Sequence, residues 1–138
     1  MTARSAVKAL VLLLTAAAFA ITFAACKEKT EPKKESYMQI TAKRAKELMD
    51  TRDDYILLDV RSEAEYAGGH IPGAICIPDN AIDARAEAEL PDKTQLILVY
   101  CRSGWRSQNA AAALAAMGYE NVKDFGGILD WPYDTETE

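Results

Sequence analysis

The sequence has little of what several classes of protein require. Its 138 residues include 16 lysines and arginines against 21 aspartates and glutamates, a formal net charge of -5, which excludes binding to nucleic acid through a general basic face. Its single histidine and three cysteines do not have the spacing of metal ligands, so we expect no metal site. There is no internal repeat, and the length leaves room for one small domain but no second catalytic one.

A long uncharged run, Ala9 to Ala25, lies near the N-terminus and follows the basic residues Arg4 and Lys8. Small residues close the run, a pattern typical of a secretory signal. The run is too short and too rich in alanine to span a membrane stably. We therefore expect residues 1–25 to be a signal peptide, and its removal makes the rest of the chain still more acidic.

The end of that segment, Phe23-Ala24-Ala25-Cys26, resembles a bacterial lipobox, although Phe23 stands where leucine is usual. The resemblance implies that Cys26 is lipidated and begins the mature chain, with a flexible charged spacer over residues 26–36. We expect a lipoprotein of the bacterial cell envelope that faces the periplasm, in the outer membrane if the cell is Gram-negative. Ordinary cleavage after Ala18-Phe19-Ala20 would instead release a soluble periplasmic protein, and an uncleaved anchor is the third option.

From Tyr37 onward, short apolar runs alternate with helical patterns. Strands are predicted at residues 37–40, 55–60, 75–77, 95–100 and 121–125, and helices at 41–50, 62–67, 80–90 and 109–117. Strands that alternate with helices at this spacing predict an α/β domain over residues 37–133, with a mostly parallel sheet and helices on both faces. The acidic tail, residues 134–138, is expected to fray.

The segment Cys101-Arg102-Ser103-Gly104-Trp105-Arg106 lies between the strand at 95–100 and the helix at 109–117. A thiol at the carboxyl end of a strand and the N-terminus of a helix meets unpaired N–H groups and the positive end of the helix dipole, which favour the thiolate. Arg102 and Arg106 add two positive charges that can hold an anion. The loop predicts that Cys101 attacks an anionic substrate.

Four segments, in this order, resemble the rhodanese-like sulfurtransferase family of single-domain type. They are Leu58-Asp59-Val60-Arg61, then Glu65 to Ile75, then Tyr100 to Ser107, and finally Gly126-Gly127-Ile128-Leu129-Asp130-Trp131. The resemblance spans most of Tyr37 to Trp131 and implies a rhodanese-like fold with a five-stranded, mostly parallel sheet.

The resemblance also implies a persulfide mechanism in which Cys101 is the catalytic, sulfur-carrying residue. Arg102, Ser103, Gly104, Trp105 and Arg106 would form the substrate-binding cradle around its sulfur. The donor would be thiosulfate or a related small anion, and the acceptor a thiol, cyanide or a protein, with no cofactor required. Trp105 departs from the smaller or polar residues common at its position, which leaves the substrate open.

Two alternatives use the same residues. Cysteine phosphatases and arsenate reductases need a wider loop, with five residues between cysteine and arginine, whereas four separate Cys101 from Arg106. A rhodanese module could also bind sulfur or dock a partner without catalysis. Arg106 itself could brace the loop through an acidic partner rather than bind substrate.

Five other residues have candidate roles. We expect Asp59 and Arg61, at the end of a strand beside that of Cys101, to support the site as an ion pair that shapes its floor. We expect His70 to make structural hydrogen bonds rather than act as a base. Cys76 and Trp131 are expected to pack in the core.

Overall fold

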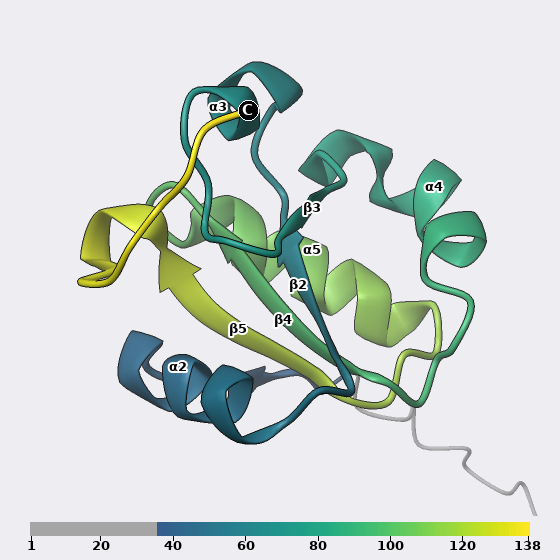
Figure 1. Cartoon of the computed structure of the whole chain (residues 1–138). Helices are drawn as coiled ribbons and strands as arrows, with labels where there is room; N and C mark the ends of the chain where they lie inside the picture. The colour runs from purple at the N-terminus through teal and green to yellow at the C-terminus, as the bar shows by residue number, and fades with distance from the viewer. Residues whose placement is uncertain (1–35) are drawn as a thin grey trace, which may run out of the picture. The chain divides into compact units, whose positions relative to one another are not determined.

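The computed structural model describes residues 36–138 and contains one five-stranded sheet (Figure 1). The predicted signal peptide, Cys26 and all but the last residue of the predicted spacer lie outside the described residues. The strand order is β1-β5-β4-β2-β3, and every neighbouring pair is parallel. The strands are β1 Met38–Gln39, β2 Tyr55–Asp59, β3 Ile75–Cys76, β4 Leu96–Cys101 and β5 Val122–Gly127.

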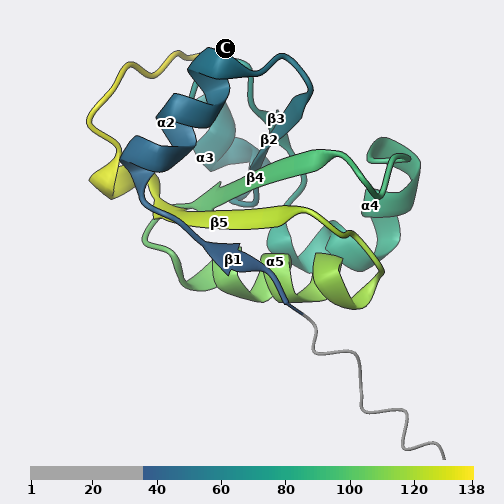
Figure 2. The same ribbon diagram turned by 90° about the horizontal axis from the view of Figure 1, so that it is seen from below.

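Helices cover both faces of the sheet, as predicted. They are α2 Ala42–Thr51, α3 Glu63–Ala67, α4 Ile82–Glu89 and α5 Trp105–Ala116, with short 3-10 turns η1 Asp79–Ala81 and η2 Ile128–Asp130. Figure 2 shows α2 and α3 on one side and α4 and α5 on the other. Within residues 36–138, no helix has the length and apolar character needed to cross a bilayer.

Each face of the sheet has its own apolar core because successive strand residues point to opposite faces. Leu58 and Val99 pack with the α4 and α5 side, whereas Leu57 and Leu98 pack with the α2 side. Strands β2 and β4 are therefore apolar almost throughout, as strands covered on both faces must be. This arrangement puts β4, the strand that ends in Cys101, in the middle of the sheet.

The helix ends follow the local sequence signals. Thr41 caps α2 by accepting a 3.1 Å hydrogen bond from the Arg44 N–H, and Ser62 and Glu65 form a capping box at the start of α3. Helix α5 starts earlier than predicted, at Trp105 rather than Asn109. The turn after β4 is completed by Gly104, so the next residues of the cysteine loop already belong to the helix.

The prediction that the acidic tail frays is wrong. His70 and Glu136 pair as in an antiparallel bridge, each N–H donating to the carbonyl of the other at 2.8 Å. The Trp131 indole N–H also donates to the carbonyl of Asp134 at 3.2 Å. The tail thus supplies partners to the backbone of a buried residue, which would otherwise lose hydrogen bonds on leaving water.

Candidate active site

Cys101 is the last residue of β4 and lies at the carboxyl edge of the sheet, with 1% of its surface exposed. The chain then turns sharply through Gly104, whose φ of 105° belongs to the left-handed region that favours glycine. This turn brings the Gly104 N–H to 3.0 Å from the Cys101 Sγ, to which it donates a hydrogen bond. The sulfur therefore lies at the N-terminus of α5, as the sequence predicted.

The end of β5 supports the loop from beside it. The Leu129 N–H donates to the carbonyl of Arg102 at 3.2 Å. The hydroxyl of Ser107 lies 3.6 Å from the Cys101 Sγ and can donate to the carbonyl of Gly104 at 3.0 Å or of Gly126 at 3.3 Å. These contacts fix the loop between β4, α5 and β5.

Several amides around the sulfur have no acceptor. Within residues 36–138, the backbone N–H groups of Ser103, Trp105 and Arg106 donate to no protein atom. They belong to the loop and to the first turn of α5, where a helix cannot satisfy its own donors. Together with the Gly104 N–H they can stabilise negative charge on sulfur or on a bound anion.

The two arginines of the loop differ in their partners. Arg106 donates from both terminal nitrogens to Glu65, at 2.8 and 2.9 Å, so it has the acidic partner that was the alternative to substrate binding. The pair lowers the pKa of Glu65 to about 2 and raises the pKa of Arg106.

Arg102 is exposed and, among the arginines in the described part of the chain, is the one with no carboxylate within 4.0 Å. The arginines that have such a partner are Arg44, Arg52, Arg61, Arg85 and Arg106. An anion that reaches the loop therefore meets a guanidinium at Arg102 that does not have to leave a carboxylate.

Asp59 and Arg61 form the predicted ion pair, with Arg61 Nη2 at 2.6 Å from Asp59 Oδ2 and both side chains buried. Arg61 also donates to the carbonyl of Gly69 at 2.7 Å, and its guanidinium lies 5.8 Å from the centre of the Tyr100 ring. The pair thus joins the ends of β2 and β4 to the turn after α3. The structure gives no contact between this pair and the Cys101 sulfur.

His70 and Trp131 have the structural surroundings expected of them. His70 Nδ1 lies 2.9 Å from the carbonyl of Tyr66, and the two rings stack at 3.8 Å. Trp131 is buried against Phe125 in the core on the α2 side. Neither residue reaches the cysteine loop through any contact in the structure.

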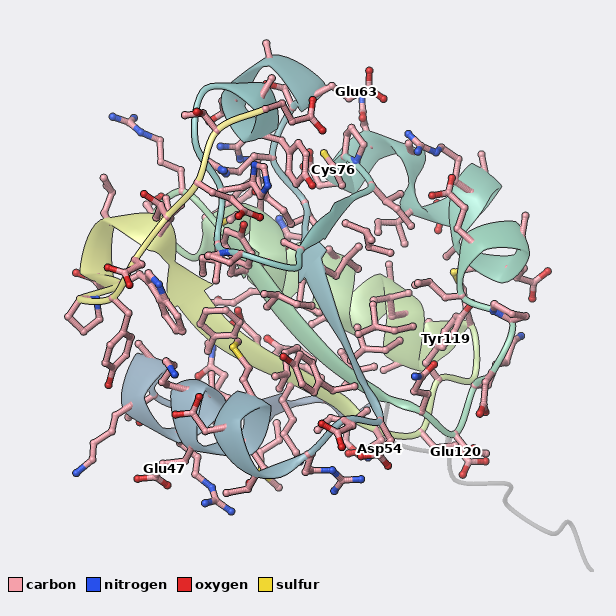
Figure 3. The ribbon with its side chains drawn as sticks, viewed as in Figure 1. Glu47, Asp54, Glu63, Cys76, Tyr119 and Glu120 are labelled. Carbon is pink, nitrogen blue, oxygen red and sulfur yellow. The ribbon has the colours of Figure 1, made fainter. Side chains whose placement is uncertain are left out.

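Cys76, on β3, is separated from Cys101 by β2, and both thiols are free. Burial and the carboxylates of Asp59 and Glu63 raise the pKa of the Cys76 thiol to about 11. Figure 3 labels Cys76 and Glu63, which lie on the same side of the molecule near α3 and β3. The structure therefore does not bring the second thiol into the site.

Two large apolar side chains at the cysteine loop are exposed to solvent. Trp105 and Leu129 are 71% and 64% exposed, although both side chains are large and hydrophobic. One belongs to the cysteine loop, and the other follows β5 and bonds the loop through its backbone. A separate hollow of about 460 Å³ between α2 and the C-terminal segment is lined by no residue of the loop.

Sequence reasoning missed Glu65 and Ser107 as residues of the site. In the sequence, Glu65 is the first residue of a segment that resembles the rhodanese-like family, and nothing there indicates that α3 lies against the start of α5. Ser107 directly follows the loop, and its place in the first turn of a helix could have indicated a side chain close to the sulfur. Both contacts depend on the packing of elements that are distant in the chain.

Comparison with known proteins agrees with this geometry. Residues 41–132 match the family model of the rhodanese-like domain. A sulfurtransferase of Allochromatium vinosum is 44% identical to this chain over 85 residues, which are 61% of this chain and 77% of the relative. The thiosulfate sulfurtransferase PspE of Escherichia coli is 38% identical over 73 residues, which are 53% of this chain and 70% of the relative.

Solved structures show the same fold. A rhodanese with anions from E. coli has a TM-score of 0.57 at 33% identity and covers 61% of this chain and 99% of its own. The Alr3790 protein from Anabaena has a TM-score of 0.65 at 30% identity, with 71% and 91% of the two chains covered. The chain belongs to the rhodanese-like domain family.

Proposed function

We propose that this protein is a sulfurtransferase that moves sulfane sulfur from thiosulfate or a related anionic donor to a thiophilic acceptor through a persulfide on Cys101. One observation carries the proposal: the buried Cys101 Sγ accepts a hydrogen bond from the Gly104 N–H at the N-terminus of α5, next to loop amides that have no acceptor in the described part of the chain. The names of the relatives, sulfurtransferase and thiosulfate sulfurtransferase, support the same chemistry.

In the first half-reaction the Cys101 thiolate attacks the outer sulfur of thiosulfate. A sulfur–sulfur bond to Cys101 forms while the sulfur–sulfur bond of the donor breaks, and sulfite leaves with the bonding pair. In the second, cyanide or a thiolate attacks the outer sulfur of the persulfide and the Cys101 thiolate leaves. The free thiolate is regenerated without an external oxidant or reductant, so the cycle requires no cofactor.

The loop residues have distinct roles in this mechanism. The N–H groups of Ser103, Gly104, Trp105 and Arg106 stabilise charge on the attacking and transferred sulfurs. Arg102, which has no carboxylate partner within residues 36–138, binds the anionic group of the donor and then the leaving sulfite. The Asp59–Arg61 pair has an indirect role: it holds the ends of β2 and β4 together, just before the loop begins.

The structure supports sulfur transfer better than it supports a cysteine phosphatase, an arsenate reductase or a docking module without catalysis. A phosphate has three terminal oxygens to wrap, whereas the ring from Cys101 to Arg106 is one residue shorter than a phosphatase loop and its arginine is held by Glu65. A docking module without catalysis would not require a buried thiol that accepts a hydrogen bond at the N-terminus of a helix. A protein could also be the sulfur acceptor, because the exposed side chains of Trp105 and Leu129 offer it a surface to contact.

The test is the intact mass of the purified protein with Cys26→Ser, before and after incubation with thiosulfate. A gain of one sulfur, about 32 Da, that dithiothreitol reverses is the expected persulfide. The gain must disappear in Cys101→Ser and persist in Cys76→Ser. A reduced, folded protein that gains no sulfur from thiosulfate would overturn the thiosulfate reaction.

We also propose that Cys26 is lipidated and anchors the protein to a bacterial envelope membrane, facing the periplasm. Cys26→Ala should then move the protein from the membrane fraction to the soluble fraction of cells that express the full chain. If the variant stays in the membrane, an uncleaved N-terminal anchor is the better explanation. If the unchanged protein is already soluble, ordinary signal cleavage is.

A further inference from the structure

Glu65 has two sets of partners that fix its carboxylate. Oε2 accepts hydrogen bonds from the Ser62 N–H and hydroxyl, both at 3.0 Å, within the capping box of α3. The same carboxylate accepts both terminal nitrogens of Arg106, at 2.8 and 2.9 Å. A bidentate pair of this kind holds the guanidinium in one plane, so α3 sets the position of a side chain that belongs to the cysteine loop.

The pair also changes the charge that a substrate meets. Cys101 is among the groups that raise the pKa of Arg106, so this guanidinium lies within electrostatic reach of the sulfur. Its charge is balanced by Glu65, whereas that of Arg102 is not balanced by any carboxylate in the described chain within 4.0 Å. The side chains of Arg102, Arg106 and Glu65 together therefore carry one net positive charge, where the two arginines without Glu65 would carry two.

We propose that Glu65 is a specificity-determining positioning residue: it holds and neutralises Arg106, so that Arg102 is the one loop side chain whose unbalanced charge binds the anionic group of the donor. The cost of taking a dianion such as thiosulfate out of water is larger than that of a monoanion, and one unbalanced cation offsets less of this cost than two would. The site therefore favours a donor with one negative charge. The exposed Trp105 and Leu129 beside the loop suit a donor with an apolar group. The chemical class with these features is the organic thiosulfonate, and this choice of donor rests on the proposed sulfur transfer.

The reaction with such a donor is balanced. The Cys101 thiolate attacks the outer sulfur of the thiosulfonate R–SO₂–S⁻, forming the persulfide and breaking the donor's sulfur–sulfur bond. The sulfinate R–SO₂⁻ leaves with the bonding pair. Two negative charges enter and two remain, so no proton or oxidant is consumed.

The role of Glu65 can be tested without any sulfur transfer. In a protein with Cys26→Ser and Cys76→Ser, Cys101 is the only thiol. Its alkylation rate constants with anionic iodoacetate and with neutral iodoacetamide then give a ratio that reports the local charge. Glu65→Gln should raise this ratio about three- to tenfold, because one negative charge near the loop is lost, and Arg106→Gln should lower it by a similar factor.

Glu63→Gln is the matched control. Glu63 is on the same helix but pairs with Arg85, at 3.3 Å, and is largely exposed (Figure 3). Its removal should leave the ratio unchanged. If Glu65→Gln also leaves the ratio unchanged, or changes both rate constants by the same factor, Glu65 does not set the charge at the sulfur and the proposal is wrong.

The donor preference needs kinetics. The unchanged protein should have a lower KM for methanethiosulfonate than for thiosulfate, and Glu65→Gln should lower the KM for thiosulfate by about three- to tenfold more than that for methanethiosulfonate. Arg102→Gln should raise both. Equal KM changes for the two donors in Glu65→Gln would overturn the specificity. If neither donor transfers sulfur in the unchanged protein, the proposed function fails, while the alkylation ratio still decides the role of Glu65.

Discussion

A Cβ atom built on Gly127 would lie 2.2 Å from the carbonyl oxygen of Arg102. It would also lie 2.7 Å from the Arg102 carbonyl carbon and from the Cα of Ser103. These are backbone atoms, so no side chain can move aside. The end of β5 and the cysteine loop therefore approach so closely that only glycine fits.

We predict that Gly127→Ala displaces the loop and reduces sulfur transfer at least tenfold. The φ of Gly127 is -117°, which alanine adopts freely, so the effect comes from the contact alone. Forcing a methyl group into a packed site costs about 1–3 kcal/mol of stability. Turnover and urea unfolding check both effects.

Gly68→Ala is the matched control for this change. Its Cβ would lie 3.4 Å from the carbonyl of Ala64, an ordinary contact, and its φ of -74° is ordinary too. Both activity and stability should stay close to those of the unchanged protein. If Gly127→Ala is as active as Gly68→Ala, the loop does not depend on its contact with β5.

Asp59→Asn should destabilise the domain strongly, because it leaves the buried guanidinium of Arg61 without its counter-charge. Breaking a buried ion pair from one side costs about 3–5 kcal/mol, which urea unfolding at pH 7 can measure. Asp54→Asn, which breaks the exposed pair with Arg52, should have no measurable effect. Similar stabilities of the two variants would show that Arg61 finds water or another partner.

The sequence predicted the order of the elements and the place of the sulfur well, because these depend on local patterns. Apolar runs such as Leu96 to Tyr100 identify buried strands, and the capping residues Thr41 and Ser62 mark helix starts. The position of Cys101 after a central strand follows from the same reasoning. The resemblance of four ordered segments agreed with the five strands and the parallel sheet, and added that the fold is rhodanese-like.

The partners of charged side chains could not be predicted. Glu65 and Arg106 are distant in the chain, and their pairing depends on how α3 lies relative to the start of α5. The docked tail was missed for the same reason: Glu136 pairs with the backbone of His70, and the acidic sequence of the tail gives no sign of it. Local composition indicates solvent exposure but not the partner that a segment meets.

Acid should weaken the domain through Glu65. The hydrogen bonds from Arg106 lower its pKa from the ordinary 4.5 to about 2 in the folded protein. A lowered folded pKa means that the stabilisation is complete above about pH 4.5 and is lost as the pH falls towards 2. We expect the effect to be about 1 kcal/mol, because the pair is partly exposed and screened by solvent.

Urea unfolding between pH 7 and pH 3 checks this. Glu65→Gln should lose part of the acid dependence, whereas Glu63→Gln should retain it, since no comparable arginine clamp holds Glu63. Parallel stability curves for the unchanged protein and Glu65→Gln would contradict the assignment of the shift to the Arg106 pair.

Cys76 should stay unmodified while Cys101 reacts. Its thiol has a pKa of about 11, raised by burial and by nearby carboxylates, so at pH 7.5 very little of it is the reactive thiolate. Strand β2 lies between it and Cys101, and neighbouring strands are about 4.8 Å apart, so the two cysteines are about 10 Å apart, beyond the reach of a disulfide. In a protein with Cys26→Ser, iodoacetamide at one equivalent should label Cys101 and leave Cys76 unlabelled, as peptide mass mapping can show. Cys76→Ser should keep full sulfur transfer, and mild oxidation should yield no disulfide between Cys76 and Cys101. An internal disulfide would mean that β3 can leave its place beside β2, so that the Cys76 thiol can attack a persulfide on Cys101.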